Sequence, residues 1–345
     1  MIVFLTGGTG FIGKPLTRQL LKRGWQVRAL VRDPDSLQAR AIADMGVTLV
    51  KGDVTDKESM RAGMIGTDIA INNAGWYEFG ITGDAVQQMF DINVKGTENF
   101  LSLAKELRVP KVVHVSSVTQ WGDTGKTIRD ETWIHEAPFH SAYEKSKYDS
   151  HMLGLQYQKE GLPLIIVCPG QVHGANDHSG FGYFLRLYLN GLNPGFGWAP
   201  DAIVAGIAVD DLAEGIALSA EKGKLGETYI LSGEPHTRRE IIKIWATKPG
   251  RIRPLFWTPL WLTQLMFATM EPLQRMVGLP AFISGETARG GAIDYHFSSQ
   301  KAQRELGWSF RSFEQMWNET ADAEIELRKK RKKRDLVSML KPLDE

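Results

Sequence analysis

The stretch TGGTGFIG at residues 6–13 decides the fold of this chain of 345 residues. An apolar run, Ile2–Leu5, precedes it, and the stretch Lys14–Arg23 that follows has the apolar spacing of a helix. Between a strand and a helix, such glycines allow a tight turn, close packing and the approach of a pyrophosphate to free N–H groups. The motif therefore predicts a dinucleotide-binding loop, with contacts from Gly7, Thr9, Gly10, Phe11, Ile12 and Gly13.

Strand-like and helix-like patterns alternate through the first half of the chain. This alternation is typical of parallel βαβ units, in which helices cover both faces of a sheet. We therefore expect an α/β fold, a doubly wound parallel Rossmann sheet with a smaller interleaved C-terminal substrate domain. Strands are predicted at Ile2–Leu5, Val27–Val31, Thr48–Lys51, Ile69–Asn72, Val112–Ser116 and Leu164–Cys168, and a helical stretch at Val86–Glu106.

The alternation of strand-like and helix-like patterns ends after Pro169-Gly170, and this change predicts a division into domains. The dinucleotide-binding domain is expected at residues 1–170, with a returning segment at about 203–233. In that segment we expect a strand at Ile203–Val209, a helix at Leu212–Ala220 with Asp210-Asp211 as its N-cap, and a strand at Tyr229–Ser232. Residues 171–202 and 234–327 are expected to form the substrate-binding domain, and residues 328–345 a basic tail.

Composition and charge exclude several classes of function. The formal net charge of +1 gives no overall field that would attract nucleic acid, so no nucleic acid partner is expected. The one cysteine, Cys168, excludes an internal disulfide, and the histidines lack metal-ligand spacing, so no metal is expected. The apolar stretch Pro254–Met270 is shorter than the roughly 20 residues of a membrane-spanning helix. Met1–Leu5 lacks the basic leader of a signal peptide, and we expect a cytoplasmic protein.

Residues 27–34, VRALVRDP, lie where a dinucleotide fold selects its cofactor. Arg32 ends the predicted strand, and a guanidinium there can pair with a 2′-phosphate, which favours NADP(H). Asp33 follows directly, and it keeps NAD open as the alternative. Asp53, after the third strand, is expected either to accept a hydrogen bond from the adenine amino group or to cap a turn.

Tyr143 and Lys147 stand four residues apart in YEKSK, so on a helix they share one face. A free tyrosine, with a pKa near ~10, is a poor catalyst at neutral pH, and a nearby ammonium lowers that pKa. Ser116 and Ser117 end a strand at the expected ligand crevice, Ser116 supporting the loop. This spacing also occurs on ordinary surface helices, and such serines also act as caps. Combined with the glycine loop, it predicts that Tyr143 exchanges a proton with a substrate oxygen bound by Ser117, while hydride moves at carbon.

The chain resembles the extended branch of the short-chain dehydrogenase/reductase superfamily, the NAD-dependent epimerase/dehydratase family, over most of its length. Besides the two motifs above, the resemblance rests on GDVTD (52–56), NNAG (72–75), NVKGT (93–97), VSSVTQWG (115–122), CPGQVHG (168–174) and FSSQKAQRELGW (297–308). Within the branch, residues 27–34 are most similar to dihydroflavonol reductases. Residues 209–234 are similar to 3-beta-hydroxysteroid dehydrogenase-like proteins.

The resemblance implies a catalytic set of Ser117, Tyr143 and Lys147, with Asn93 as a helper in a proton relay, and it implies a homodimer. Beyond the glycine loop, it implies cofactor contacts from Val54, Asn73, Ala74, Ser116, Tyr143, Lys147, Pro169, Gly170 and Val172. Trp76 and Tyr77 follow NNAG on a loop near the crevice, so we expect them to contact substrate.

The sequence also departs from the family at two places. Ala208 stands where relatives often have histidine. Val118-Thr119 follows Ser117 where sugar-nucleotide dehydratases usually have an acidic pair, which argues against dehydration.

Three functions are open from the sequence. Arg32, the Ser–Tyr–Lys set and the apolar residues 256–270 favour an NADP(H)-dependent reductase or dehydrogenase of a fairly apolar small molecule. The alternative is an NAD-dependent epimerase of a nucleotide-linked sugar. A non-catalytic NADP sensor ranks last, because such proteins typically lose the Tyr–Lys pair. The basic run Arg328–Arg334 is expected to be a solvated helix end or a site of peripheral membrane contact with anionic lipid.

Overall fold

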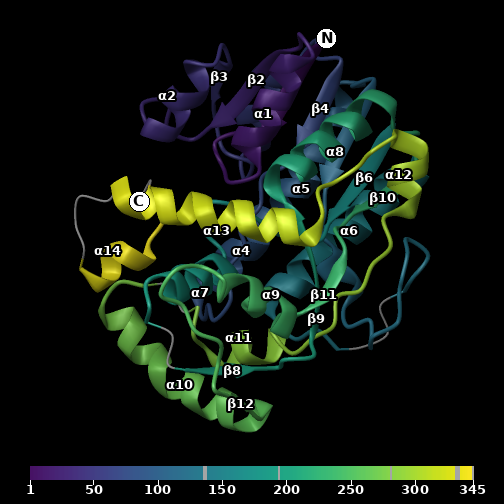
Figure 1. Ribbon diagram of the computed structural model, residues 1–345. Coiled ribbons are helices and arrows are strands. Elements are labelled where there is room, and N and C mark those ends of the chain that lie inside the picture. The colour runs from purple at the N-terminus through teal and green to yellow at the C-terminus, as the bar shows by residue number, and fades with distance from the viewer. Residues whose placement is uncertain (135–137, 193–194, 280–281, 331–334, 344–345) are drawn as a thin grey trace.

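The computed structural model describes residues 1–134, 138–192, 195–279, 282–330 and 335–343 (Figure 1). Within these residues, seven parallel strands form the central sheet, in the order β10-β6-β5-β4-β1-β2-β3. The strand order reverses between β1 and β4, the point at which a doubly wound sheet opens a crevice for a ligand. The predicted α/β fold with a parallel Rossmann sheet is confirmed.

The strands of the central sheet form where the β-branched runs predict them. Strands β4 and β6 are buried along their whole length, as expected for strands covered on both faces. In chain order the strands are β1 (Ile2–Thr6), β2 (Gln26–Val31), β3 (Thr48–Lys51), β4 (Ile69–Asn72), β5 (Lys111–Val115), β6 (Leu164–Pro169) and β10 (Thr228–Leu231).

Helices cover both faces of this sheet, and side chains of each strand alternate between two apolar cores. In β1, Val3 and Leu5 belong to one core and Phe4 belongs to the other. The first core receives α1 (Gly13–Lys22), α2 (Leu37–Ala43), α8 (Val209–Lys222) and α12 (Gln300–Leu306), and the second receives α3 (Lys57–Met64), α5 (Gly96–Glu106) and α6 (Ala142–Lys159).

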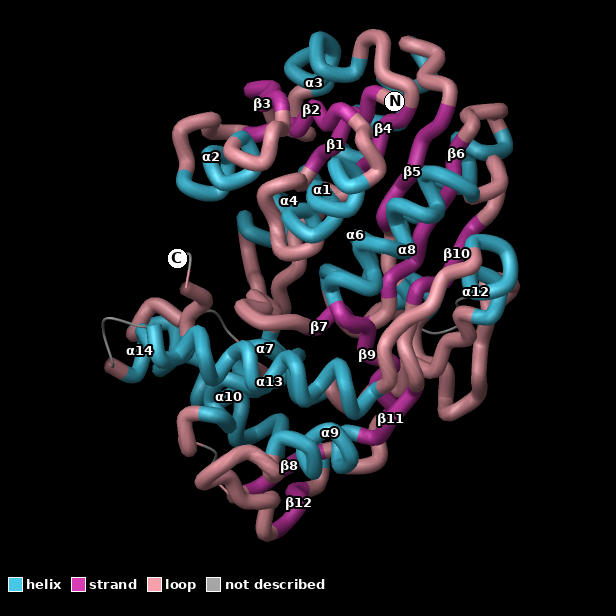
Figure 2. The backbone as a smooth tube through the Cα atoms, turned by 45° about the horizontal axis from the view of Figure 1, so that its top comes forward, coloured by secondary structure: helices cyan, strands magenta, loops and turns pink. Residues whose placement is uncertain are grey.

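A smaller lobe lies beyond the carboxyl ends of the central strands, as Figure 2 shows. In the described chain it holds a sheet of three strands, β11-β9-β7, and a parallel pair, β8 and β12. Its strands are β7 (Gln171–His173), β8 (Phe196–Trp198), β9 (Ile203–Ala208), β11 (Pro235–Thr237) and β12 (Phe256–Thr258). Its helices are α7 (Gly180–Leu189), α9 (Arg238–Trp245), α10 (Leu260–Met276), α11 (Gly285–Gly290), α13 (Phe313–Lys330) and α14 (Leu336–Leu340).

Three local predictions need correction. The helical stretch expected at Val86–Glu106 consists of α4 (Asp84–Phe90), a π-helical turn η1 (Asp91–Lys95) and α5. It is divided because the wider π-helical turn interrupts the α-helical hydrogen bonds. Helix α8 begins at Val209 with Ala208 as N-cap, so Asp210 and Asp211 lie in its first turn. There their charges favour the helix dipole without capping it.

The strand expected in the returning segment forms as β9, but it pairs with β7 and β11 of the small sheet. The return to the central sheet therefore begins with α8 and ends in β10. We propose that the dinucleotide-binding domain comprises residues 1–170 and about 209–233, and that the smaller lobe comprises residues 171–208 and 234–327. The predicted boundary at 202 thus moves to 208, because β9 belongs to the smaller lobe. No helix among the described residues is long and apolar enough to cross a membrane.

A buried ion pair joins two helices of the smaller lobe. Arg186 of α7 lies 3.1 Å from a carboxylate oxygen of Glu324 of α13, and both side chains are at most 3% exposed. The same oxygen accepts a hydrogen bond from the backbone N–H of Asn176 at 2.7 Å. Glu324 thereby fastens α13 to α7 and to the loop after β7.

Replacing Glu324 by alanine should lower the free energy of unfolding by about 3–5 kcal/mol, because Arg186 would keep a buried charge without its partner. Denaturant unfolding measures this loss. The matched control is Glu326→Ala on the same helix, whose exposed pair with Lys329 should contribute less than about 1 kcal/mol. Equal losses in the two variants would contradict the structural role of Glu324.

Candidate active site

A cleft of about 1180 Å³ opens between the central sheet and the smaller lobe. The loops after β1, β4, β5 and β6 form one side of it, and residues of α9, α11 and β8 form part of the other. Ligands of doubly wound folds bind at this edge of the sheet. The cleft contains 17 of the predicted site residues: Gly7, Thr9, Gly10, Phe11, Ile12, Gly13, Arg32, Asp53, Val54, Asn73, Ala74, Trp76, Tyr77, Ser117, Tyr143, Gly170 and Val172.

In the glycine loop, Gly7 and Gly13 are packed closely against the backbone, whereas Gly10 has space around it. A Cβ on Gly7 (φ +68°) would lie 2.9 Å from the backbone of Ala74, and one on Gly13 would lie 1.9 Å from the carbonyl oxygen of Gly7. At Gly10 the nearest atom would be at 3.4 Å, an ordinary contact. The packing of the protein therefore does not require glycine at position 10, whereas the approach of a ligand from the cleft does.

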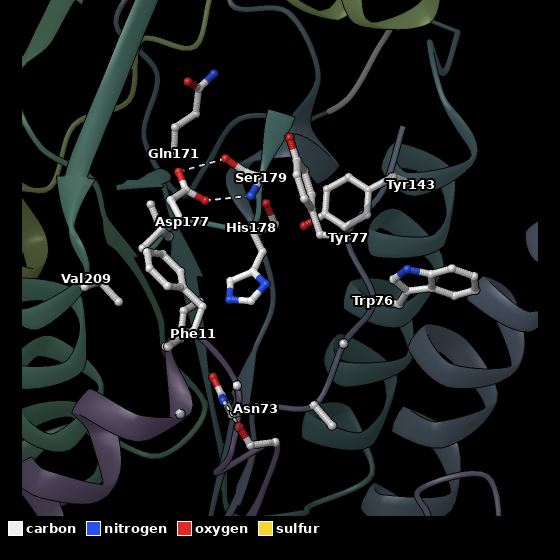
Figure 3. A pocket seen from close by; sticks show the side chains of 18 of the residues that line it. Phe11, Asn73, Trp76, Tyr77, Tyr143, Gln171, Asp177, His178, Ser179 and Val209 are labelled. Atoms are coloured by element: carbon white, nitrogen blue, oxygen red, sulfur yellow. Dashed lines mark hydrogen bonds between the residues drawn. The ribbon is translucent and has the colours of Figure 1, made fainter. Parts of the chain in front are cut away.

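Thr6 holds the ends of β1 and β4 together beneath this loop. Its hydroxyl accepts hydrogen bonds from the N–H groups of Asn73 (3.1 Å) and Ala74 (3.0 Å) and donates to Oδ1 of Asn72 (2.9 Å). The Asn73 amide also donates to the Gly7 carbonyl at 3.3 Å, while its Oδ1 is buried without a partner in the described chain (Figure 3). An acceptor left in this position fits a cofactor that supplies a donor. Sequence reasoning missed Thr6, although it stands at the end of the first strand.

Arg32 is the charged side chain that the end of β2 presents to the cleft. It is exposed, and it makes no hydrogen bond or ion pair with the described part of the chain. The Asp33 carboxylate instead accepts from the N–H of Asp35 at 2.9 Å and does not line the cleft. Asp53 lines the cleft, and its Oδ1 accepts from Thr55 N–H (2.8 Å) and Oγ1 (2.7 Å). The predicted turn cap is therefore observed, and the adenine contact stays a prediction.

Tyr143 lies in the first turn of α6, with its phenol group at the cleft. The side chains of Ser117 and Thr119 lie beside the phenol at the cleft, and Thr119 donates to Ser117 Oγ at 2.9 Å. The ring of Tyr77 packs edge-on against it, with centroids 4.7 Å apart (Figure 3). The ring of Phe79 also packs edge-on against it, with centroids 6.2 Å apart. Burial raises the pKa of Tyr143 to about 12, and the two hydroxyls act in the opposite direction.

Lys147 lies one turn further along α6, behind the wall of the cleft. Its ammonium donates to the carbonyl oxygen of Val115 at 3.2 Å, and a Cβ on Gly75 would stand 3.9 Å from Nζ. Burial lowers the pKa of Lys147 to about 8. Lys147 is not among the groups that shift the pKa of Tyr143 here, so the predicted lowering of that pKa by Lys147 stays a prediction.

Asn93 sits in the π-helical turn η1 and does not line the cleft. Its side chain accepts from the N–H of Trp76 (2.7 Å) and donates to the carbonyl of Trp76 (2.9 Å) and to Ser146 Oγ (3.0 Å). These bonds tie the loop after β4 to helix α6. They identify a positioning contact, and the predicted proton relay stays a prediction.

Two further predicted residues lie behind the cleft. Ser116 Oγ is buried and lies 3.1 Å from Nδ1 of His151. Pro169 is the last residue of β6, and the backbone enters the cleft only at Gly170. The described residues contain no group of three or more His, Cys, Asp and Glu side chains that could hold a metal ion.

The smaller lobe adds cleft residues that sequence reasoning did not single out. Most are aromatic, and one is a buried arginine. The signal for some of them was the glycine- and aromatic-rich composition of residues 171–200, which names no particular position. The residues of the smaller lobe are Asp177, His178, Ser179, Phe181, Phe184, Trp198, Arg238 and Tyr295, and Phe79 of the loop after β4 joins them at the cleft.

Known proteins resemble this chain in sequence. The profile of the family described as "NAD dependent epimerase/dehydratase family" matches residues 3–232. A protein of Synechocystis sp. that is provisionally named dihydroflavonol 4-reductase is 31% identical over 322 residues, 88% of this chain and 89% of its own. A protein of Stigmatella aurantiaca, named 4-hydroxy-2-methyl-3-oxo-4-farnesyl-3,4-dihydroquinoline-1-oxide ketoreductase, is 30% identical over 72% of this chain and 74% of its own.

Solved structures match over nearly the whole chain. The structure of gox2253 has a TM-score of 0.78 and 28% identity, and it covers 94% of this chain and 98% of that chain. A UDP-glucose 4-epimerase of Thermus thermophilus in complex with NAD has a TM-score of 0.72 at 24% identity, covering 94% and 99%. At that identity the likeness concerns the fold alone.

Alanine substitutions at Gly10 and Gly13 should have different effects on stability and on binding. Gly10→Ala should keep the melting temperature and weaken dinucleotide binding by about tenfold or more, because its methyl group would occupy the ligand's place. Gly13→Ala should lower the melting temperature as well, because its Cβ overlaps the Gly7 carbonyl. Thermal unfolding and calorimetric titration with NADP⁺ measure both effects. Unchanged NADP⁺ affinity in Gly10→Ala would remove the loop from the binding site.

Proposed function

The chain belongs to the NAD-dependent epimerase/dehydratase family, and we propose that it is an NADP(H)-dependent oxidoreductase that interconverts a carbonyl and an alcohol on a fairly apolar substrate. The observation that carries this proposal is the meeting of Tyr143 and Ser117 in the cleft that begins at the glycine loop. A bound nicotinamide would supply or accept the hydride there. Gly10, Asn73 and Arg32 are the residues whose surroundings fit such a cofactor.

Tyr143 is the proposed general acid and base. In the reduction its phenol gives a proton to the substrate oxygen, and in the oxidation it takes that proton back. Ser117 hydrogen-bonds the same oxygen, since its side chain lines the cleft beside the phenol. The substrate oxygen is therefore held at two points while hydride transfer occurs at the carbon.

Lys147 and Asn93 support this exchange from behind the cleft wall. The buried ammonium of Lys147 stabilises the phenolate of Tyr143 electrostatically and can reach ribose hydroxyls past Gly75, where no side chain intervenes. Asn93 fixes the loop that carries Gly75 and Trp76 against α6. A shift of this loop would move the substrate oxygen away from the phenol.

The apolar character of the substrate follows from the rings that line the cleft beside Tyr143. Tyr77 and Phe79 contact the catalytic ring directly, and Phe181, Phe184 and Trp198 continue the wall into the smaller lobe. Relatives' names agree with this class: a farnesyl-quinoline ketoreductase, a sterol demethylase protein B of Methylococcus capsulatus and a 3-beta-hydroxysteroid dehydrogenase of Mycolicibacterium neoaurum.

Two expected interactions stay predictions: the homodimer and the peripheral membrane contact of the basic run. In the described part of the basic run, Arg328 donates to the Leu189 carbonyl at 3.0 Å and Lys329 pairs with Glu326 at 2.6 Å. These contacts hold the end of α13. Residues 331–334 lie outside the described residues.

Tyr143→Phe should lower kcat for carbonyl reduction about 10²–10⁴-fold and leave NADP⁺ affinity nearly unchanged, because it removes only the acidic hydroxyl. NADPH oxidation with a panel of ketones and aldehydes measures this change. Tyr157→Phe, on the same helix but away from the cleft, is the control and should retain activity. Substantial turnover by Tyr143→Phe would refute its role, and tightly bound NAD released on denaturation would favour the sugar epimerase instead.

Arg32→Asp should weaken NADP⁺ binding about 100-fold while changing NAD⁺ affinity far less, since the guanidinium pairs only with the 2′-phosphate. Fluorescence titration with both cofactors measures the ratio of the two dissociation constants. Arg40→Asp makes the same change of charge on α2 outside the cleft, and it should leave that ratio unaltered. An unchanged ratio in Arg32→Asp would exclude Arg32 as the selector.

A further inference from the structure

Arg238 brings a buried positive charge to the substrate side of the cleft. It is the first residue of α9 and is only 6% exposed. Its guanidinium carbon lies 4.3 Å from the ring centroid of Trp198 and 5.8 Å from that of Phe181, so it is held between two aromatic rings. Burial lowers the pKa of Arg238 to about 10, which leaves it charged at neutral pH.

No carboxylate pairs with Arg238 in the described part of the chain. Its Nη2 donates to the carbonyl oxygen of Gly291 at 2.5 Å, whereas its Nε is buried without any acceptor. The neighbouring Arg239 lies 3.5 Å from Asp201 at the surface. A buried cation without a counter-charge is costly, so its presence beside a cleft indicates a ligand that supplies the charge.

Trp198 provides a second donor without an acceptor at the same place. Its indole Nε1 is buried and has no partner among the described residues. A Cβ on Gly291 would lie 2.8 Å from Nη2 of Arg238 and 3.1 Å from Nε1 of Trp198. The two side chains therefore converge beside Gly291, a cleft residue without a side chain to obstruct them.

The convergence point and Tyr143 belong to opposite sides of the cleft, and Phe79 lies between them. The ring of Phe79 is 6.2 Å from the ring of Tyr143, and a Cβ on Gly290 would lie 3.8 Å from Phe79 Cζ. One aromatic ring and the Gly290-Gly291 pair thus separate Arg238 from Tyr143. A substrate with its carbonyl at Tyr143 would present its far end to Arg238.

The other charged groups of the cleft are already engaged or lie elsewhere. Both oxygens of Asp177 accept from Ser179, at 2.7 Å from its N–H and 2.8 Å from its hydroxyl (Figure 3). Asp210 faces Arg18 at 3.4 Å near the glycine loop, and Asp53 caps its own turn. None of these carboxylates neutralises the positive charge of Arg238.

We propose that Arg238 and Trp198 bind a carboxylate at the end of the substrate remote from the reacting carbonyl. The substrate class is then an aromatic or lipophilic keto acid and its hydroxy acid, an assignment that rests on the proposed function above. A carboxylate has two oxygens for the two donors and one charge for the one cation. Among the described residues, the rings and glycines around Arg238 offer no second cation for a nucleoside diphosphate.

The test measures binding of matched acids and esters to the full-length protein saturated with NADP⁺. The probes are 4-acetylbenzoate and 5-oxo-5-phenylpentanoate, each with its methyl ester. The wild-type protein should bind at least one acid about tenfold or more tightly than its ester. Arg238→Gln should abolish that preference, and Trp198→Phe should reduce it while keeping the ring beside Arg238.

Arg239→Gln is the matched control and should keep the full preference, because Arg239 points to the surface. Arg238→Lys serves if Arg238→Gln fails to fold, and it should lose most of the preference, since an ammonium lacks the Nε donor. Equal affinities for acids and esters in the wild type, or a preference that survives in the Arg238 variants, would overturn the proposal. The carboxylate assignment would also be overturned if UDP bound more tightly than the acids and lost this affinity in Arg238→Gln.

Turnover separates failure of this inference from failure of the proposed function. If the esters are reduced with NADPH and the acids show no advantage, the oxidoreductase proposal stands and the carboxylate site is wrong. If the acids bind through Arg238 and neither acids nor esters are reduced, the carboxylate site stands and the carbonyl chemistry is wrong.

Discussion

The contact between the glycine loop and the end of β4 is the constraint on which the rest of the site depends. Gly7 has a positive φ and leaves only enough room for the backbone of Ala74, and the Thr6 hydroxyl binds the two N–H groups that follow β4. The loop after β4 then passes Gly75 and Trp76, where Asn93 ties it to α6. A side chain on Gly7 would therefore disturb both the cofactor loop and the helix of Tyr143.

Burial shifts the pKa values of the proposed catalytic pair, Tyr143 and Lys147, in opposite directions. The pKa of Tyr143 rises to about 12 and that of Lys147 falls to about 8, because a dry site disfavours phenolate and ammonium alike. A tyrosine that is held protonated is a ready proton donor to a carbonyl. Formation of the phenolate in the reverse reaction then needs positive charge nearby, which Lys147 and an oxidised nicotinamide would both supply.

Much of this arrangement could be predicted from short patterns. The β-branched runs located the central strands, and the glycine loop and YEKSK motif located residues that the fold brings to one cleft. Other features depend on contacts between distant segments. No local pattern signals the pairing of β9 with β7, the π-helical turn at Asn93 or the lack of a carboxylate partner for Arg238 among the described residues. Each of these features depends on segments far apart in the sequence. The pKa of Tyr143 was likewise unpredictable, because it depends on burial.

A crystal structure of the protein with NADP⁺ would show directly whether the cofactor lies where these residues require it. We expect the pyrophosphate against Gly10, the 2′-phosphate paired with Arg32, and the nicotinamide ring beside Tyr143 with its ribose toward Lys147. A cofactor bound with its nicotinamide away from Tyr143, or with its 2′-phosphate free of Arg32, would rule out the proposed site.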